Sequence, residues 1–302
     1  MRRARARRSP STADEAATTV LRLAVLLQAG MAPARAWALA AESGDAVAAS
    51  VRTAIDAGDT VSVAIARHGG AWPSVAAAWT IATTVGAPLA DTLRAVAGAL
   101  RDAQETSDDI RVTLAEPAAT ARLMSWLPLV AIGLGAALGF DTFAVLVTDP
   151  LGLACLVAGA LLILGGRRWT AALVRRAQPG AGIPGLDAEL FAVALSGGAS
   201  IERARSVVAA SGAPASAPAA MPGSSVDEVL DLSQRAGVPA VELLRATASL
   251  ARHRARVDGR LRASRLSSRL LLPLGVCTLP AFLLLGVAPM LLGVVSSMSL
   301  SL

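Results

Sequence analysis

The sequence of 302 residues has no lysine, no tyrosine and no asparagine, and aromatic side chains make up only 3% of it. All 28 basic residues are therefore arginines, which outnumber the 22 acidic residues and give a formal net charge of +6. Proteins that bind nucleic acid through such a surplus commonly add aromatic side chains that stack on bases. Here the arginines gather beside apolar runs instead, so we expect no nucleic acid among the partners.

Side chains with catalytic or metal-binding chemistry are also scarce. The two cysteines, Cys155 and Cys277, both lie in apolar runs, where we expect small core residues rather than a disulfide. The two histidines, His68 and His253, are far apart in the sequence. There is no P-loop, nucleophile triad or zinc-type spacing. We therefore expect no catalytic, cofactor-binding or metal site, and no enzymatic activity.

Long apolar runs are abundant. Hydrophobic residues make up 54% of the chain, and its mean hydropathy of +0.56 is typical of a membrane protein with soluble portions. Two runs, at about residues 123–140 and 150–168, flank a short acidic loop and predict a transmembrane hairpin over 123–168. A third run at 270–295 contains three prolines that we expect to kink it. The sequence thus predicts three transmembrane helices.

The arginines beside these runs predict the topology. Arg122 precedes the first run, and Arg167, Arg168, Arg175 and Arg176 follow the second. The loop between the runs has no basic residue. By the positive-inside rule, both ends of the hairpin lie in the cytoplasm and the loop lies outside. We expect a multi-pass protein of the plasma (inner) membrane, with a retained, disordered basic arm at residues 1–13 and an external tail at 296–302.

The two stretches outside the membrane have helical patterns. Residues 14–122 show apolar side chains at three- and four-residue spacing and predict about six helices, the last and longest beginning at Pro88. Residues 178–269 form a second, shorter stretch of the same kind. No alternating pattern indicates a strand. The fold class we predict is all-α, with two homologous cytoplasmic helical bundles.

An internal repeat supports this homology. A Leu-x-x-Gly element ends at Gly30 in the first stretch and at Gly198 in the second. A helix-start motif then occurs in each stretch. It comprises Gly86, Pro88, Asp91 and Arg94 in the first, and Gly237, Pro239, Glu242 and Arg245 in the second. Glycine ends one helix, proline begins the next, and the acid suits the helix dipole. We interpret Asp91 and Glu242 as helix-start acids rather than recognition residues.

Two further features suggest contacts. Ala131, Gly135 and Gly139 form a stripe of small residues suited to close helix packing, within the monomer or in a dimer. The arginine-dense segment at residues 252–269 is a candidate for contact with an acidic partner or with anionic lipid headgroups. The mixed charges of the helix after Pro88, among them Asp102 and Asp109, we interpret as a solvated or partner-facing surface.

These motifs, in the order bundle, two spans, bundle, one span, resemble the type II secretion F family. This family comprises the inner-membrane platform proteins of type II secretion, type IV pili and Tad (Flp) pili. The lack of lysine and the shorter second stretch look most like actinobacterial Tad-type members. The resemblance implies cytoplasmic bundles that dock onto a hexameric secretion ATPase and a membrane part that handles pilin or pseudopilin subunits.

The function we expect is therefore a non-enzymatic platform that couples the ATPase to subunit extraction. Its other expected partners are a second platform protein or a second copy of the chain, and membrane lipids. The alternative is a membrane subunit of a transporter or permease. Transporters place polar groups at mid-membrane, whereas these spans have acids only at the loop edges, at Asp141 and Asp149.

Overall fold

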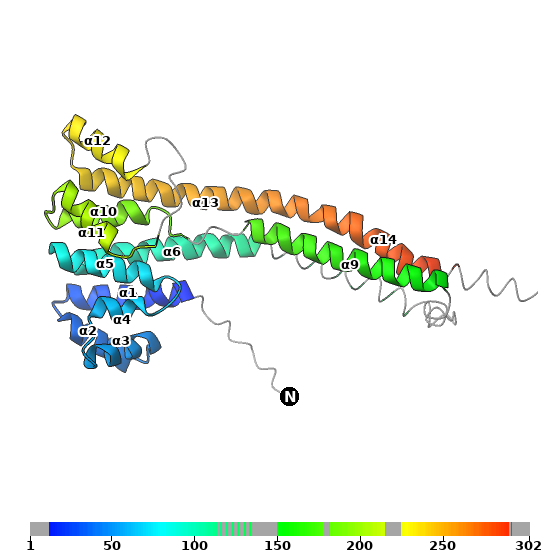
Figure 1. Cartoon of the computed structure of the whole chain (residues 1–302), viewed down its shortest axis with the longest axis horizontal. Helices are drawn as coiled ribbons and strands as arrows, with labels where there is room; N and C mark the ends of the chain where they lie inside the picture. The colour runs from blue at the N-terminus through cyan, green and yellow to red at the C-terminus, as the bar shows by residue number, and fades with distance from the viewer. Residues whose placement is uncertain are drawn as a thin grey trace, which may run out of the picture. The chain divides into compact units, whose positions relative to one another are not determined.

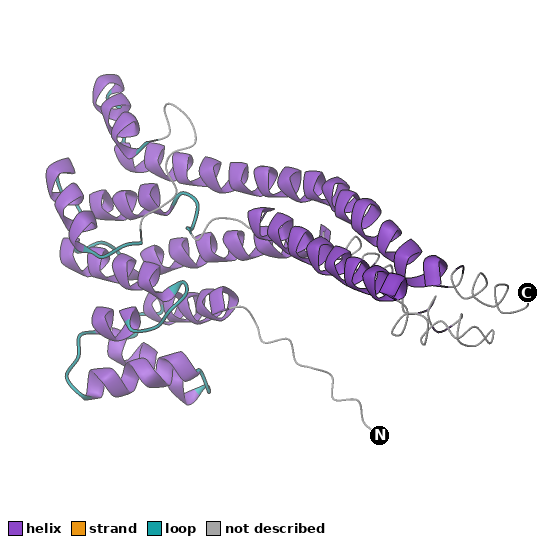
Figure 2. Ribbon diagram, turned by 45° about the vertical axis from the view of Figure 1, so that its right-hand side comes forward, coloured by secondary structure: helices purple, strands orange, loops and turns teal. Residues whose placement is uncertain are grey.

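The structure, a computed structural model, describes residues 12–113, 150–177, 182–214 and 225–289, together with seven single positions between 115 and 291. The described residues form helices and connecting loops, and no strand occurs among them (Figure 2), which confirms the all-helical prediction. The chain divides into two compact units. The first comprises Met1–Thr106 and Gly180–Val257, and the second comprises Ser107–Pro179 and Asp258–Leu302.

The first helical stretch contains six helices among its described residues, and the last of them is the longest (Figure 1). They are α1 (Thr12–Gln28), α2 (Pro33–Glu42), α3 (Ala46–Asp56), α4 (Val61–Ala66), α5 (Trp72–Val85) and α6 (Leu89–Thr113). Local chemistry sets several of the boundaries. Pro33 occupies the first turn of α2, and the Asp45 carboxylate caps α3 by accepting from the Ala48 N–H at 2.9 Å. The Thr19 hydroxyl of α1 also donates to Asp45, so this cap joins two helices.

The second helical stretch contains four helices among its described residues. They are α10 (Leu186–Ser196), α11 (Ile201–Ala210), α12 (Val226–Ala236) and α13 (Ala240–Pro273). A capping box begins α12: the Ser225 hydroxyl accepts from the Glu228 N–H, and the Glu228 carboxylate accepts from the Ser225 N–H. Residues 215–224, between α11 and α12, lie outside the described residues.

The two helical stretches, treated above as separate bundles, share one hydrophobic core. That core contains side chains from α1 to α6, including the fully buried Trp37, and also Leu186, Leu190 and Val193 of α10. Helix α5 packs against α4 of its own stretch and against α10 and α11 of the other. A smaller core joins α10, α12 and α13. Burial of apolar surface therefore holds the two stretches together as one unit.

The close approach of the two stretches depends on a glycine. A Cβ placed on Gly197, which ends α10, would lie 2.5 Å from Cγ2 and 2.6 Å from the carbonyl oxygen of Val85 at the end of α5. Both separations are shorter than any normal contact, so no larger residue fits there without a shift of the backbone. Glycine at 197 thus allows the end of α10 to rest directly on the end of α5.

The second unit contains α9 (Pro150–Ala177) and the last part of α13. It continues as the π-helix η1 (Leu274–Thr278), α14 (Leu279–Phe282) and the π-helix η2 (Leu283–Val287). Pro273 and Pro280 lack an N–H and crowd the preceding turn, which interrupts the regular helical ladder. The described part of the chain has wider π turns here, and the kinks expected from sequence stay a prediction.

Two glycines of α9 form the contact with this segment. A Cβ on Gly159 would lie 2.5 Å from Leu285, and one on Gly166 would lie 3.0 Å from the Cβ of Cys277. Both cysteines are free, with Cys277 buried and Cys155 half-buried. The absence of a side chain at 159 and 166 lets the two helices approach closely, as small residues do between membrane helices.

Among the residues that the structure describes, two helices are long and apolar enough to cross a membrane, over Pro150–Arg175 and Ala240–Val287. The predicted span at 123–140, with Ala131, Gly135 and Gly139, lies outside the described residues apart from single positions. The loop at 141–149 and the tail at 296–302 also lie outside them, as does most of the arm at 1–13.

Candidate functional site

The two helix-start motifs have the same backbone geometry. Helix α5 ends at Gly86 with φ of 74°, and α12 ends at Gly237 with φ of 67°. Both angles are in the left-handed region that favours glycine. Pro88 directly precedes α6, and Pro239 directly precedes α13. In the structure one helix thus ends and another begins at each motif.

The acid of each motif pairs with the arginine three residues later. Asp91 Oδ1 lies 3.4 Å from Arg94 Nη1, and Glu242 Oε1 lies 3.6 Å from Arg245 Nη1. All four side chains are exposed, so each pair contributes only about 0.2–0.5 kcal/mol to helix stability. Arg94 also donates to the Gln28 side chain at the end of α1. This geometry favours the interpretation of Asp91 and Glu242 as helix-start acids.

The Leu-x-x-Gly elements are equivalent in the same way. Gly30 has φ of 84° and Gly198 has φ of 82°. The Gly30 N–H donates to the Leu27 carbonyl and the Gly198 N–H to the Leu195 carbonyl, each at 3.0 Å. Two elements separated by more than a hundred residues of sequence thus repeat one local structure.

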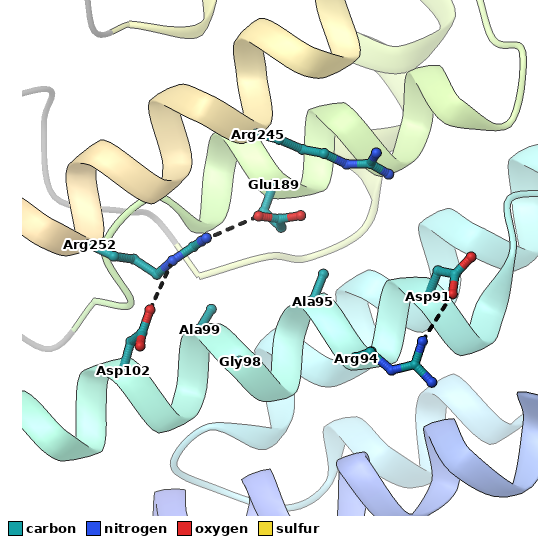
Figure 3. Close-up of a pocket in the computed structure, with 9 residues that line it drawn as sticks. All are labelled: Asp91, Arg94, Ala95, Gly98, Ala99, Asp102, Glu189, Arg245 and Arg252. Atoms are coloured by element: carbon teal, nitrogen blue, oxygen red, sulfur yellow. Dashed lines mark hydrogen bonds and ion pairs between the residues drawn. The ribbon is translucent and has the colours of Figure 1, made fainter.

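A buried ionic cluster lies where α6, α10 and α13 meet (Figure 3). Glu189 of α10 is only 5% exposed, and its Oε2 lies 3.3 Å from Arg252 Nη1 of α13. Arg252 Nε lies 3.1 Å from Asp102 Oδ2 of α6, and Arg256 Nη1 lies 3.7 Å from the other oxygen of Asp102. Arg252 therefore bridges a carboxylate of the first helical stretch and a carboxylate of the second. We call these four residues the ionic cluster.

A close backbone contact brings the members of this cluster together. Gly185, just before α10, has φ of 75°, and a Cβ there would lie 2.6 Å from the carbonyl oxygen of Ala248 in α13. One turn further along each helix, Glu189 meets Arg252. Because a larger residue at 185 would push the helices apart, this glycine sets the distance at which the buried ion pair forms.

Beside the cluster is an open groove of about 520 Å³. It is lined by Asp91, Arg94, Ala95, Gly98, Ala99 and Asp102 of α6, Glu189 of α10, and Arg245 and Arg252 of α13 (Figure 3). The groove brings together Asp91 and Arg94 of the first helix-start motif with Arg245 of the second. The glycines and prolines of the two motifs do not line the groove; they lie where helices end and begin. Small residues and paired charges are suited to contact with a partner, and the lining contains no histidine, cysteine or serine.

No group of three or more histidine, cysteine, aspartate or glutamate side chains that could hold a metal occurs in the part of the chain that the structure describes. The groove itself is lined by arginines, carboxylates and small residues. Its charged side chains are already partnered within the protein, which favours a structural or docking role.

Sequence reasoning missed the ionic cluster. Asp102 was grouped with the solvated charges of α6, and Arg252 with the arginines open to a partner or to lipid. In the structure the Arg252 side chain is only 16% exposed and turns inward. The available signal is the pair of acids, Asp187 and Glu189, within the otherwise apolar run from Leu186 to Leu195. A charged residue in such a run needs a buried partner, but the sequence does not indicate which arginine supplies it.

Comparison with known proteins gave one finding on the family. Residues 20–136 match the family model described as "Type II secretion system (T2SS), protein F". No curated protein and no solved structure showed a significant match. The match covers the first helical stretch and part of the apolar run after it, and it independently supports the resemblance to the type II secretion F family.

Proposed function

We propose that this protein is an inner-membrane platform of a type II secretion or Tad-type pilus assembly machine. In this role it couples a hexameric cytoplasmic ATPase to the extraction of pilin or pseudopilin subunits. The family match points to the secretion and pilus platform family, whose members are associated with membranes. The two long apolar helices are consistent with that location.

The observation that carries the proposal is the continuity of α13. It runs without interruption from Ala240 to Pro273, so its first part lies in the first unit and its last part in the second. Within the first unit, Arg252 holds it to α6 and α10 through the ionic cluster. A displacement imposed on the first unit would then act on a helix that continues into the apolar segment.

The equivalent geometry of the motifs supports an origin of the two helical stretches by duplication. Both helix-start motifs end one helix in a left-handed glycine and begin a long helix after a proline. We infer that duplication supplied two long helices, α6 and α13, that begin alike and approach the membrane from the same side. In this scheme ATP hydrolysis belongs to the partner, and the chain itself is not an enzyme.

A pair of proline substitutions tests the coupling. Ala255→Pro breaks the interior of α13, where proline costs about 3 kcal/mol, whereas Ala240→Pro falls at the first helical position, where proline is tolerated. In cells that lack the native gene, both variants are expected to co-purify with the secretion ATPase. Only Ala240→Pro is expected to restore surface fibres, measured by electron microscopy and shear release of pilin.

Two results would count against the proposal. Normal fibre assembly by Ala255→Pro would show that a continuous α13 is not needed for coupling. Failure of the unmodified chain to co-purify with any secretion ATPase, at normal expression, would remove the platform role itself. Pilin synthesis, measured in whole cells, should be unchanged in every strain.

A further inference from the structure

The outward face of α9 changes its chemistry along its length. Val157, Leu161 and Leu164 are exposed and follow one another at four- and three-residue spacing, which places them on one helix face. The same spacing continues to Arg168 and Arg175, which are also exposed. One continuous stripe therefore passes from apolar side chains to arginines between Leu164 and Arg168. We call this change the step, and Arg167 lies beside it.

The last part of α13 shows the same change in the opposite sequence direction. Arg265 and Arg269 are exposed, and the stripe continues at three- and four-residue spacing to Leu272 and Val276. Leu272 and Val276 are each 57% exposed. An exposed stripe of large apolar side chains is costly in water and is expected where another apolar phase covers it.

The two steps occur at the same level of the second unit. Gly166 of α9 faces Pro273 and Cys277, with its Cβ position 3.9 Å from the Pro273 carbonyl oxygen. The step on α9 lies within one turn of Gly166, and the step on α13 lies within one turn of Pro273. On both antiparallel helices, the exposed face thus changes from apolar side chains to arginines at the same level.

The arginines of both helices flank one contact. Leu266 and Leu270 of α13 pack with Leu173 and Val174 of α9. Arg265 and Arg269 each precede one of these leucines, and Arg175 follows Val174. Trp169, 43% exposed, directly follows Arg168 on α9, within two turns of the last apolar residue of the stripe. Tryptophan is enriched at this position in membrane proteins because its ring is amphipathic.

We propose that Arg167, Arg168, Arg175, Arg265 and Arg269, the arginine collar, bind the phosphates of anionic phospholipids. This inference rests on the membrane location within the proposed function. Guanidinium groups bind phosphate oxygens in bidentate fashion, and the collar lies where phosphates would lie if lipid tails covered the exposed apolar stripes.

Arginines next to the collar in α13 have different contacts from those of the collar. Arg260 is paired with Asp109 at 2.7 Å, and Arg262 donates to the Asp258 carbonyl at 3.2 Å. No carboxylate among the described residues lies within ion-pair distance of a collar arginine. Arg254 and Arg262 are exposed as well and form no ion pair with a described carboxylate, so it is the place of the collar beside apolar surface that favours a lipid over an acidic protein.

Lipid titration of the purified full chain in a neutral detergent tests this. Dioleoylphosphatidylglycerol is expected to raise the Tm of the unmodified chain, whereas dioleoylphosphatidylcholine and free glycerol 3-phosphate are not. Arg265→Gln with Arg269→Gln should weaken the apparent phosphatidylglycerol affinity about 25-fold, at about fivefold for each arginine. Lysine at the same two positions should restore part of the response, because it keeps the positive charge but not the bidentate geometry.

The matched control removes the same charge elsewhere, with Arg203→Gln and Arg254→Gln, both exposed arginines of the first unit. It should respond to phosphatidylglycerol as the unmodified chain does. All four sites are exposed, so the Tm without lipid reveals any variant that fails to fold.

Equal responses of the collar variant and the control would overturn the assignment, as would a response to glycerol 3-phosphate alone. Loss of ATPase co-purification by the collar variant in phosphatidylcholine alone would identify the collar as an acidic-protein surface instead. Because the titration needs neither ATPase nor fibre, its failure is distinct from failure of the platform role.

Discussion

At the scale of single residues, the most informative side chain is Arg252. It is one of seven arginines between residues 252 and 269, and nothing in that sequence distinguishes it from the others. In the structure it is only 16% exposed and contacts Glu189 and Asp102. A buried arginine between two carboxylates is worth little compared with a well-packed apolar group, but removal of one partner leaves a charge buried without compensation.

Arg252→Met is therefore expected to destabilise the protein. Methionine keeps much of the apolar stem but leaves the Glu189 carboxylate unpaired, which costs about 3–5 kcal/mol. For a protein of this size, that corresponds to a fall in Tm of about 10 °C, measured on the full chain in detergent.

Arg254→Met, at an exposed position two residues away, is the control and should shift the Tm by no more than a degree or two. Equal melting of the two variants would show that the ionic cluster does not contribute to stability.

At the scale of the element, the pairing of α9 with the segment after Pro273 depends on glycine. Gly165 and Gly166 are adjacent glycines, so their residue type does not distinguish them. Gly166 is buried against Cys277, whereas a Cβ on Gly165 meets nothing within 4 Å. The two glycines differ only in the side of α9 on which they lie, and only the side of Gly166 contacts Cys277.

We expect Gly166→Val to force α9 away from Cys277, at a cost of about 1–3 kcal/mol for overpacking. The alkylation rate of the Cys277 thiol, followed in a Cys155→Ala background, should rise because the thiol loses its cover.

Gly165→Val carries the same β-branched penalty in a helix and is the matched control, with alkylation unchanged. If both valines altered the thiol equally, the contact of Gly166 with Cys277 would be wrong.

At the scale of the whole molecule, the decisive property is topology. The arginines after α9 and the acidic loop before it predict that residues 178–269 lie on the same side of the membrane as residues 14–122. The common core of the two helical stretches requires the same arrangement, since α10 cannot pack on α5 across a bilayer. Sequence and packing therefore agree on one compartment for the first unit.

Reporter fusions test this topology. An alkaline phosphatase fused after Thr148 or after Leu302 is expected to be active, because the sequence predicts that both positions lie outside. The same reporter near Gly180 should be inactive, whereas green fluorescent protein there should fluoresce. Activity of the phosphatase near Gly180 would reverse the orientation and separate the first unit from a cytoplasmic ATPase.

The features that could be predicted from sequence are those with local causes. Helix ends at Gly86 and Gly237, starts after Pro88 and Pro239, and left-handed turns at Gly30 and Gly198 follow from backbone chemistry within a few residues. The apolar runs depend on composition in the same way. Ala131, Gly135 and Gly139, chosen as a packing stripe by spacing alone, lie outside the described residues, so that choice stays a prediction.

Tertiary structure decided what depends on two distant segments at once. The helical pattern of each stretch specified an apolar face but not its partner, so the single core shared by α5 and α10 could not be predicted. The pairing of Glu189 with Arg252 and Asp102, and of Gly166 with Cys277, has the same origin. Arg252 differs from the other arginines, and Gly166 from Gly165, because each is buried against a distant part of the chain. Which residues become buried depends on how the distant segments pack, and the local sequence does not specify that packing.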